Sequence, residues 1–275
     1  MNRIRLSSLV GCLAGLLIAG TMAVAQTKSP EKKTQQPPAR SPGQRALDQS
    51  AEENKFTFLV FYKTDTPAVR AMLKSAKDGV AKRNDKTAVA LVQITDPAEK
   101  ALVDQFDVAR SPMPLTLAVA PNKAVTGIFS KELKDEHFDG ALVTPTMTRC
   151  MKSLQEGKLV FVCLQKSEKD AAPPVVGAMQ LDPEFGSRVV VTTLSIGDPE
   201  EARFLQQMQV DPSQVRTPLA SLLAPPGVLV GKFDGAAKKD QVITALHKAG
   251  KCCDDPNCQH NHGASTQRPA TSKRK

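Results

Sequence analysis

Apolar positions along the chain alternate between unbroken runs and helical spacing. Residues 56–62 and 158–164 are nearly continuous apolar runs, which are typical of buried parallel strands. Residues 69–80 instead repeat apolar side chains every three or four positions, which predicts an amphipathic helix. Thr66 and Pro67 precede this helix as an N-cap and a first-turn proline. Because parallel strands need a crossover connection, the pattern predicts a strand–helix–strand unit.

The same pattern occurs twice. Asp96-Pro97 recurs 102 residues later as Asp198-Pro199, and both pairs predict a capped helix start. Other segments match in the same order: 56–62 with 158–164, 87–94 with 189–196, 105–108 with 207–210, 120–121 with 224–225, and 138–141 with 233–236. An ordered set of matches indicates two copies of one domain.

Each copy is predicted to contain a strand, a helix, a strand, a helix, a strand led by proline, a further strand and a closing helix. The last two strands are expected to form an antiparallel hairpin. This order resembles the thioredoxin fold. Phe61-Tyr62 is similar to the family's Phe-Trp pair before its redox motif. Met113-Pro114 resembles the family's cis-proline segment, as does Thr217-Pro218 in the second copy.

The resemblance implies two tandem thioredoxin-like three-layer α/β domains, over residues 46–157 and 158–250. Each would have a central mixed sheet flanked by helices. Two unrelated α/β domains of some other family are the alternative.

The family's Cys-x-x-Cys motif is missing from both copies. It belongs at a helix N-terminus, where backbone N–H groups and the helix dipole stabilise a thiolate. The aligned positions here are Thr66 and Val69, and in the second copy they fall near Glu168 and Ala171. We therefore expect no disulfide exchange by the family's route, and we interpret Thr66 as an N-cap rather than a nucleophile. Catalytic motifs of other classes are also absent from the sequence.

One dense cluster of metal-ligand residues follows the last predicted helix. It lies in residues 251–262 and consists of Cys252, Cys253, Cys258, His260 and His262. Thiolate and imidazole are the usual ligands of Zn²⁺, and thiolate also favours Cu(I). In an oxidising compartment, a Cys253–Cys258 or Cys252–Cys258 disulfide is an equal alternative. A Cys150–Cys163 disulfide also stays open; without such bonds both residues are expected to be small hydrophobic core side chains.

Both ends of the chain are expected to lie outside the folded domains. Residues 1–25 carry a basic start, an apolar run and an Ala-x-Ala site, which predict a secretory signal peptide. A membrane anchor and a lipoprotein signal at Cys12 are the alternatives. Residues 26–45 are predicted to be a disordered linker and residues 263–275 a disordered basic tail. The chain's formal net charge is +9, but the basic excess lies in these ends, so a nucleic-acid partner is not expected.

These observations together predict a protein exported to the bacterial cell envelope, periplasmic or extracellular, with no membrane span after cleavage of the signal. By its resemblance to redox-inactive thioredoxin-like modules, it would bind an unidentified envelope protein and would not act as an enzyme. One alternative is a metal-handling protein that captures Zn or Cu with the Cys/His cluster. A further alternative is a thiol oxidoreductase that uses the cysteines of that cluster.

Overall fold

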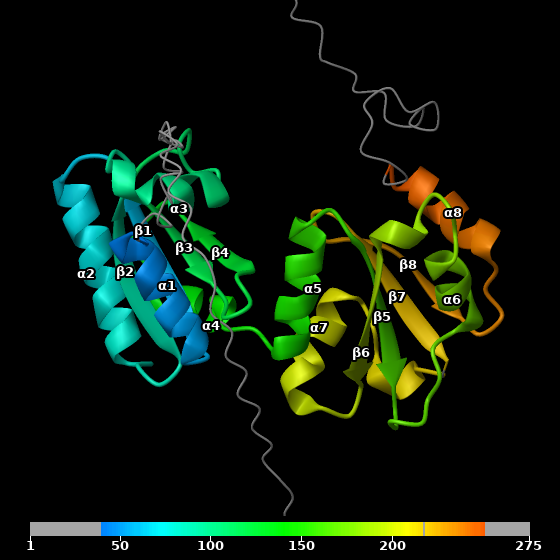
Figure 1. Ribbon diagram of the computed structural model, residues 1–275. Helices are drawn as coiled ribbons and strands as arrows, with labels where there is room; N and C mark the ends of the chain where they lie inside the picture. The colour runs from blue at the N-terminus through cyan, green and yellow to red at the C-terminus, as the bar shows by residue number, and fades with distance from the viewer. Residues whose placement is uncertain (1–39, 217, 251–275) are drawn as a thin grey trace, which may run out of the picture. The chain divides into compact units, whose positions relative to one another are not determined.

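The computed structural model describes residues 40–216 and 218–250. They form two domains, each built on its own four-stranded sheet (Figure 1). The first domain contains α1 (Pro42–Glu52), β1 (Phe56–Tyr62), α2 (Pro67–Ala81), β2 (Thr87–Gln93), the 3-10 helix η1 (Pro97–Glu99), α3 (Lys100–Gln105), β3 (Leu115–Val119), β4 (Val125–Phe129) and α4 (Asp135–Ala141).

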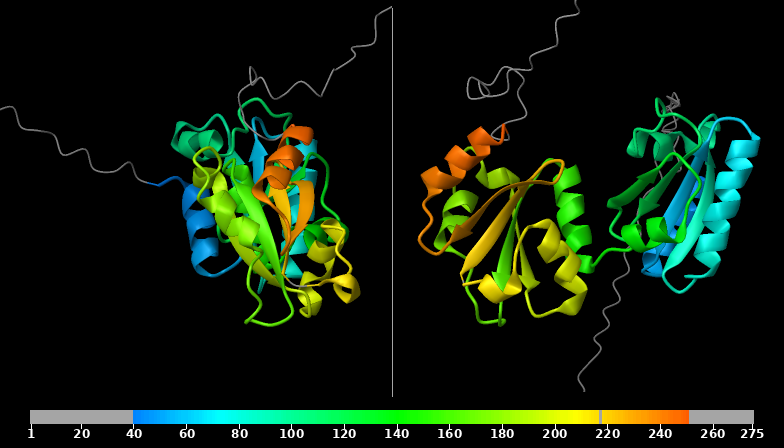
Figure 2. Two further views of the ribbon diagram at one scale, coloured as in Figure 1. Left: turned by 90° about the vertical axis from the view of Figure 1, so that its right-hand side faces the viewer. Right: turned by 180° about the vertical axis from the view of Figure 1, so that it is seen from behind.

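The second domain repeats this order. It contains α5 (Pro145–Gln155), β5 (Leu159–Gln165), α6 (Pro174–Gln180), η2 (Gly186–Arg188), β6 (Val189–Ser195), η3 (Pro199–Glu201), α7 (Ala202–Gln207), η4 (Pro212–Gln214), β7 (Leu219–Ala224), β8 (Val228–Asp234) and α8 (Lys239–Lys248). Figure 2 shows its strands with the helices around them.

The two sheets have the same topology. Their strand orders are β2-β1-β3-β4 and β6-β5-β7-β8. The first two strands of each domain are parallel, and each last pair is an antiparallel hairpin, as the sequence predicts. A bulge interrupts both hairpins at the same place, between Ala118 and Val119 and between Leu222 and Leu223. This shared topology defines two thioredoxin-like α/β domains.

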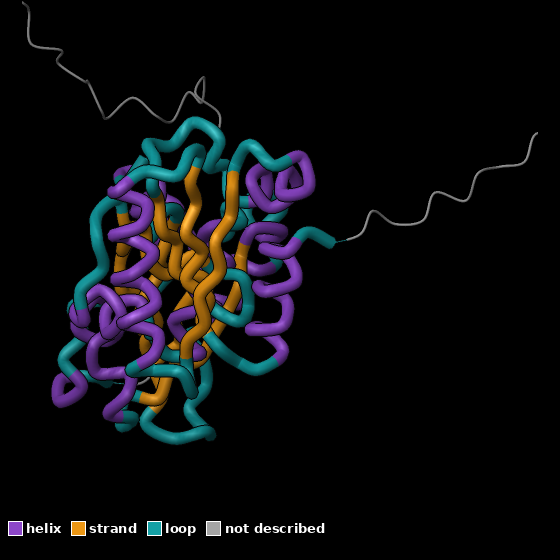
Figure 3. Tube along the Cα trace, turned by 90° about the vertical axis from the view of Figure 1, so that its left-hand side faces the viewer, coloured by secondary structure: helices purple, strands orange, loops and turns teal. Residues whose placement is uncertain are grey.

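Helices cover both faces of each sheet (Figure 3). In the first domain, α1 and α3 pack on one face through Leu47 and Leu102. Helices α2 and α4 pack on the other face through Met72 and Phe138. In the second domain, α5 and α7 share one core cluster, and α6 and α8 share the other. Burial of both faces explains why β1 and β5 are continuously apolar.

Each domain opens with a helix that is absent from the predicted order, which begins with a strand. The first domain begins before residue 46, because α1 starts at Pro42 within the expected linker and Leu47 is buried in the first core. The expected boundary at residue 157 also differs from the structure. Helix α5 was assigned to the end of the first domain, but Cys150 and Leu154 pack with the strands of the second sheet. The closing helix of the first domain is α4.

Buried glutamates fix both opening helices. Ser41 caps α1, and its hydroxyl donates to Glu99 Oε2 at 2.6 Å, while the Gly43 N–H donates to Glu99 Oε1 at 2.8 Å. In the second domain the Thr144 hydroxyl donates to Glu201 Oε2 at 2.9 Å. Glu99 and Glu201 end the matching segments that begin with Asp96-Pro97 and Asp198-Pro199.

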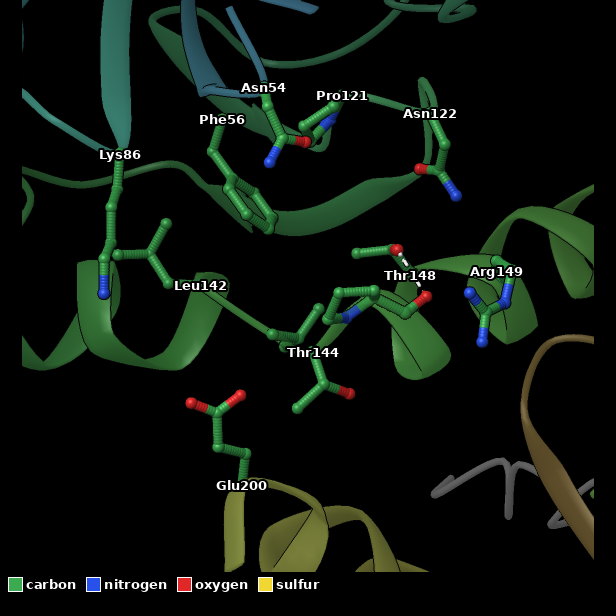
Figure 4. A pocket seen from close by; sticks show the side chains of 12 residues that line it. Asn54, Phe56, Lys86, Pro121, Asn122, Leu142, Thr144, Thr148, Arg149 and Glu200 are labelled. Atoms are coloured by element: carbon green, nitrogen blue, oxygen red, sulfur yellow. Dashed lines mark hydrogen bonds between the residues drawn. The ribbon is translucent and has the colours of Figure 1, made fainter. Parts of the chain in front are cut away.

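The start of α5 is held by hydroxyl groups. Thr144 Oγ1 also accepts the Met147 N–H at 3.2 Å, and Thr148 Oγ1 donates to the Pro145 carbonyl at 2.9 Å (Figure 4). Helices α1 and α5 therefore begin in the same way, with a hydroxyl N-cap followed by a first-turn proline: Ser41-Pro42 and Thr144-Pro145.

One segment of the sequence repeat does not correspond in space. Phe138 lies in α4, whereas Phe233 lies in β8, so residues 138–141 and 233–236 are not equivalent. The true counterpart of Phe233 is Phe129 on β4. Each of these rings lies beside the glycine two residues earlier on its strand, Gly127 or Gly231. The match of 56–62 with 158–164 is shifted by one residue: Phe56 pairs with Thr87 and Leu159 with Val189, so Leu159 and not Lys158 is the counterpart of Phe56. Asp107 and Gln209 do correspond, since both have positive φ, 49° and 55°.

Among the residues that the structure describes, no helix is long and apolar enough to cross a membrane.

Candidate functional site

The aligned redox positions and the proline segment of the first domain lie at the same end of its sheet. Here the central strand β1 ends and its neighbour β3 begins, and we call this end of the sheet the β1–β3 edge. Phe61, near the carboxyl end of β1, pairs with Leu115, the first residue of β3. The loop that leads to Thr66 and the Met113–Pro114 segment therefore begin at the same edge. In the second domain, Leu164 pairs with Leu219 in the same manner.

Thr66 has a structural role at this edge. It is the N-cap of α2, and its Oγ1 accepts the Val69 N–H at 3.3 Å. The Val69 side chain is 5% exposed. The two positions that carry cysteine in the redox motif thus hold a helix cap and a buried aliphatic side chain. Neither side chain can form a disulfide.

The second domain differs in its loop length. Glu168 and Ala171, the positions given by the constant offset, lie in the loop before α6. This loop is longer than its counterpart, since β5 ends at Gln165 and α6 begins only at Pro174. The helix start that corresponds to Thr66-Pro67 is Pro173-Pro174, and Pro173 offers no side-chain cap.

The proline segments precede β3 and β7. The Met113–Pro114 peptide bond is cis, as expected for this bond. Met113 and Pro114 are half-buried. Pro218 is also half-buried, but Thr217 lies outside the described residues, and with it the expected cis bond to Pro218. That these segments face a ligand stays a prediction.

The two thiols in the described domains are buried and separate. Cys150 and Cys163 are both free and both 2% exposed. They belong to core clusters on opposite faces of the second sheet, so they do not form the disulfide that the sequence left open. Removal from water raises the pKa of the Cys150 thiol to about 12 and that of the Cys163 thiol to about 11. Both groups are therefore protonated at neutral pH in the absence of a bound metal.

The Cys/His cluster follows Gly250, the last residue that the structure describes. Cys252, Cys253, Cys258, His260 and His262 all lie outside the described residues. Within residues 40–216 and 218–250, no three His, Cys, Asp or Glu side chains are grouped so that they could hold a metal ion. Zinc or copper binding by the cluster stays a prediction.

No protein-family model and no curated protein matches this sequence. Several solved structures are similar to it. The NTD_N/C domain of alkylhydroperoxide reductase AhpF from Enterococcus faecalis is 14% identical, with 74% of this chain and 96% of that chain covered and a TM-score of 0.28. The first two thioredoxin domains of Eps1p from Naumovozyma dairenensis are 9% identical, with 78% and 96% covered and a TM-score of 0.28.

A disulphide isomerase from Xylella fastidiosa Temecula1 is 19% identical, with 35% of this chain and 83% of that chain covered and a TM-score of 0.27. At these identities and scores, the likeness carries no argument about function. The topology described above is the basis for calling the two domains thioredoxin-like.

Proposed function

We propose that this chain is an exported, redox-inactive binding module of the cell envelope, which holds an extended segment of a partner protein at the β1–β3 edge of its first domain. The observation that carries the proposal is the start of α2. There a cap, Thr66, and a buried side chain, Val69, occupy the positions of the redox cysteines.

The side chains at this edge suit an extended apolar segment. Tyr62 ends β1 and Met113 precedes β3, and both are half-buried, so each has an apolar surface to offer. Lys63 and Asp65, in the loop between β1 and α2, are exposed. A methionine is adaptable enough to accept different apolar side chains of a partner. This combination favours recognition of an unfolded or extended chain over a reaction with it.

A direct test measures binding of an unfolded protein to the mature chain. The probe is fluorescently labelled, reduced and carboxymethylated lactalbumin, which has no free thiol and cannot form a disulfide with the protein. We expect a saturable rise in fluorescence anisotropy. Met113→Ser should weaken this binding because it removes the apolar contact.

The matched control is Ile128→Ser. Ile128 is an apolar side chain that is 68% exposed, and it lies on the outer strand β4 rather than at the β1–β3 edge. It should leave the affinity unchanged. Absence of binding, or equal weakening by both substitutions, would contradict the proposed binding edge.

Metal handling by the Cys/His cluster is the second candidate function. Its support is the sequence alone, in which three Cys and two His fall within residues 252–262. Elemental analysis of the mature protein, purified without added metal, should find about one equivalent of zinc or copper. Replacement of Cys252, Cys253 and Cys258 by serine should remove it. A metal-free wild-type protein would instead support a disulfide in this segment.

A further inference from the structure

A hollow within the second domain has four sulfur-bearing residues among those that line it. It has a volume of about 400 Å³ and lies between α5, the end of α7 and the turn between β7 and β8. No acidic or basic side chain is among the residues that line it. Its sulfur-bearing residues are Met147, Cys150, Met151 and Met208.

The helices bring these sulfur-bearing side chains together. Met147, Cys150 and Met151 are spaced at i, i+3 and i+4 on α5, so they lie on one face of the helix. Met208 is the C-cap of α7 and packs in the same core cluster as Cys150. The rim includes the exposed residues Gln207 and Gln209, so the hollow opens toward solvent.

The first domain shows that the fold itself does not require sulfur here. We align α1 with α5 by their N-caps, Ser41 and Thr144. Gln44, Leu47 and Asp48 then occupy the positions of Met147, Cys150 and Met151. Phe106 takes the place of Met208. The polar side chains there are bonded to each other, since Asp48 Oδ1 accepts from Gln44 Nε2 and from Lys123 Nζ, each at 3.0 Å. At these aligned positions, sulfur-bearing side chains thus occur in the second copy alone.

We infer that this hollow is a Cu(I) site, with Met147, Cys150, Met151 and Met208 as its ligands. Thioether and thiol sulfur are soft donors, which select Cu(I) over harder cations, and no carboxylate lines the hollow to favour Mg²⁺ or Ca²⁺. Binding through Cys150 forms a copper–sulfur bond and releases the thiol proton to water, with no change in oxidation state. This inference does not depend on the peptide-binding function proposed above.

The test uses the full mature chain, with its Cys/His cluster disabled by replacing Cys252, Cys253 and Cys258 with serine and His260 and His262 with glutamine. Cu(I) is titrated without oxygen against the chelator bicinchoninate. We expect one equivalent to bind. Substitution of Met147 and Met151 together by leucine should weaken binding about 10-fold or more, since even the loss of an outer-shell partner weakens metal sites that much.

The matched control is Met179→Leu. Met179 is fully buried, but it lies on the opposite face of the same sheet, against α6. Leucine conserves the volume of methionine, so each variant should stay folded at a cost below about 1.5 kcal/mol per site. X-ray absorption of the bound copper should report sulfur ligands. No uptake by the cluster-disabled chain, equal affinity of both leucine variants, or a copper shell of nitrogen and oxygen would overturn the inference.

Discussion

At the scale of single residues, one buried glutamate in each domain holds the start of that domain's first helix. Glu99 is 3% exposed and Glu201 is 5% exposed. A carboxylate accepts hydrogen bonds but donates none, so it suits the hydroxyl and N–H donors at a helix start. The Asp-Pro-x-Glu repeat marks both positions in the sequence. It does not show that the glutamates are buried, because that depends on contacts with residues more than fifty positions away.

Glu99→Gln should lower the free energy of unfolding of the first domain by about 1–3 kcal/mol. Glutamine replaces one acceptor oxygen with an NH₂ group, which faces the donor of Ser41 or Gly43. Urea unfolding followed by circular dichroism measures the change. The control is Glu132→Gln. Glu132 is exposed, so this substitution should change the free energy of unfolding by less than about 0.5 kcal/mol. Similar effects of the two substitutions would refute this role for Glu99.

Asp182 should make the second domain sensitive to acid. Lys239 Nζ donates to Oδ2 at 2.9 Å, and the N–H groups of Glu184 and Phe185 donate to Oδ1, so these bonds lower the pKa of the carboxyl below its ordinary value. A lowered pKa in the folded state stabilises the fold above the ordinary pKa, about 4, and this contribution is lost as pH falls through the lowered value.

Asp182→Asn should therefore be less stable than the wild type at neutral pH, and the difference should shrink as the pH falls below about 4. Thermal unfolding across a pH series measures both proteins. A difference that stays constant down to the lowest pH would show that this carboxylate is not responsible.

At the scale of elements, the contact between α2 and α4 depends on a glycine. A Cβ atom at Gly79 would lie 2.1 Å from the Phe138 ring, so only glycine allows this approach. Phe138 also packs on Phe58, with ring centroids 4.5 Å apart, and the Arg83 guanidinium lies 5.2 Å from its centroid. Arg83, just after the end of α2, forms ion pairs with Asp139 at 2.7 Å and Asp135 at 3.1 Å, both in α4.

Gly79→Ala should destabilise the first domain by about 1–3 kcal/mol, because the aromatic ring must move out of its place in the core. Gly177→Ala is the matched control in α6, where a Cβ would meet no atom within 4 Å. There the better helix propensity of alanine should stabilise the fold by up to about 1 kcal/mol. Chemical unfolding of both variants should give opposite signs, and equal signs would contradict the account of this contact.

At the scale of the whole molecule, the sequence predicts the strands, the parallel and antiparallel pairings and the duplication. These follow from unbroken apolar runs and from capped helix starts, which are local signals. The domain boundaries do not follow in the same way. Residues 42–45 come after a stretch rich in Pro, Lys and Gln and share its composition, although Ser41-Pro42 is the same helix-start signal as Thr66-Pro67.

The candidate sites were predictable to different degrees. The loss of the redox cysteines at Thr66 and Val69 can be read directly from the chain. The start of α6 could not be located by a constant offset, because the loop before it is longer in the second copy. The hollow beside α5 could not be predicted either, since methionines at helical spacing usually indicate core packing, and the open volume appears only in the structure.

Export is testable on the whole chain. The small-residue site at Ala23-Val24-Ala25 predicts a mature protein that begins at Gln26. N-terminal sequencing of the protein recovered from the cell envelope should give this start. A first residue of Met1, or a lipid-modified Cys12, would contradict the predicted processing.

The central claim is that these two thioredoxin-like domains bind without exchanging disulfides. The most direct test measures whether the mature chain accelerates the reduction of insulin by dithiothreitol. We expect the rate of dithiothreitol alone, both for the wild type and for the variant with serine at Cys252, Cys253 and Cys258. Acceleration that persists in the variant would show that Cys150 or Cys163 is an active thiol. Acceleration that is lost in the variant would make the chain an oxidoreductase that uses the Cys/His cluster. Either result would contradict binding without disulfide exchange.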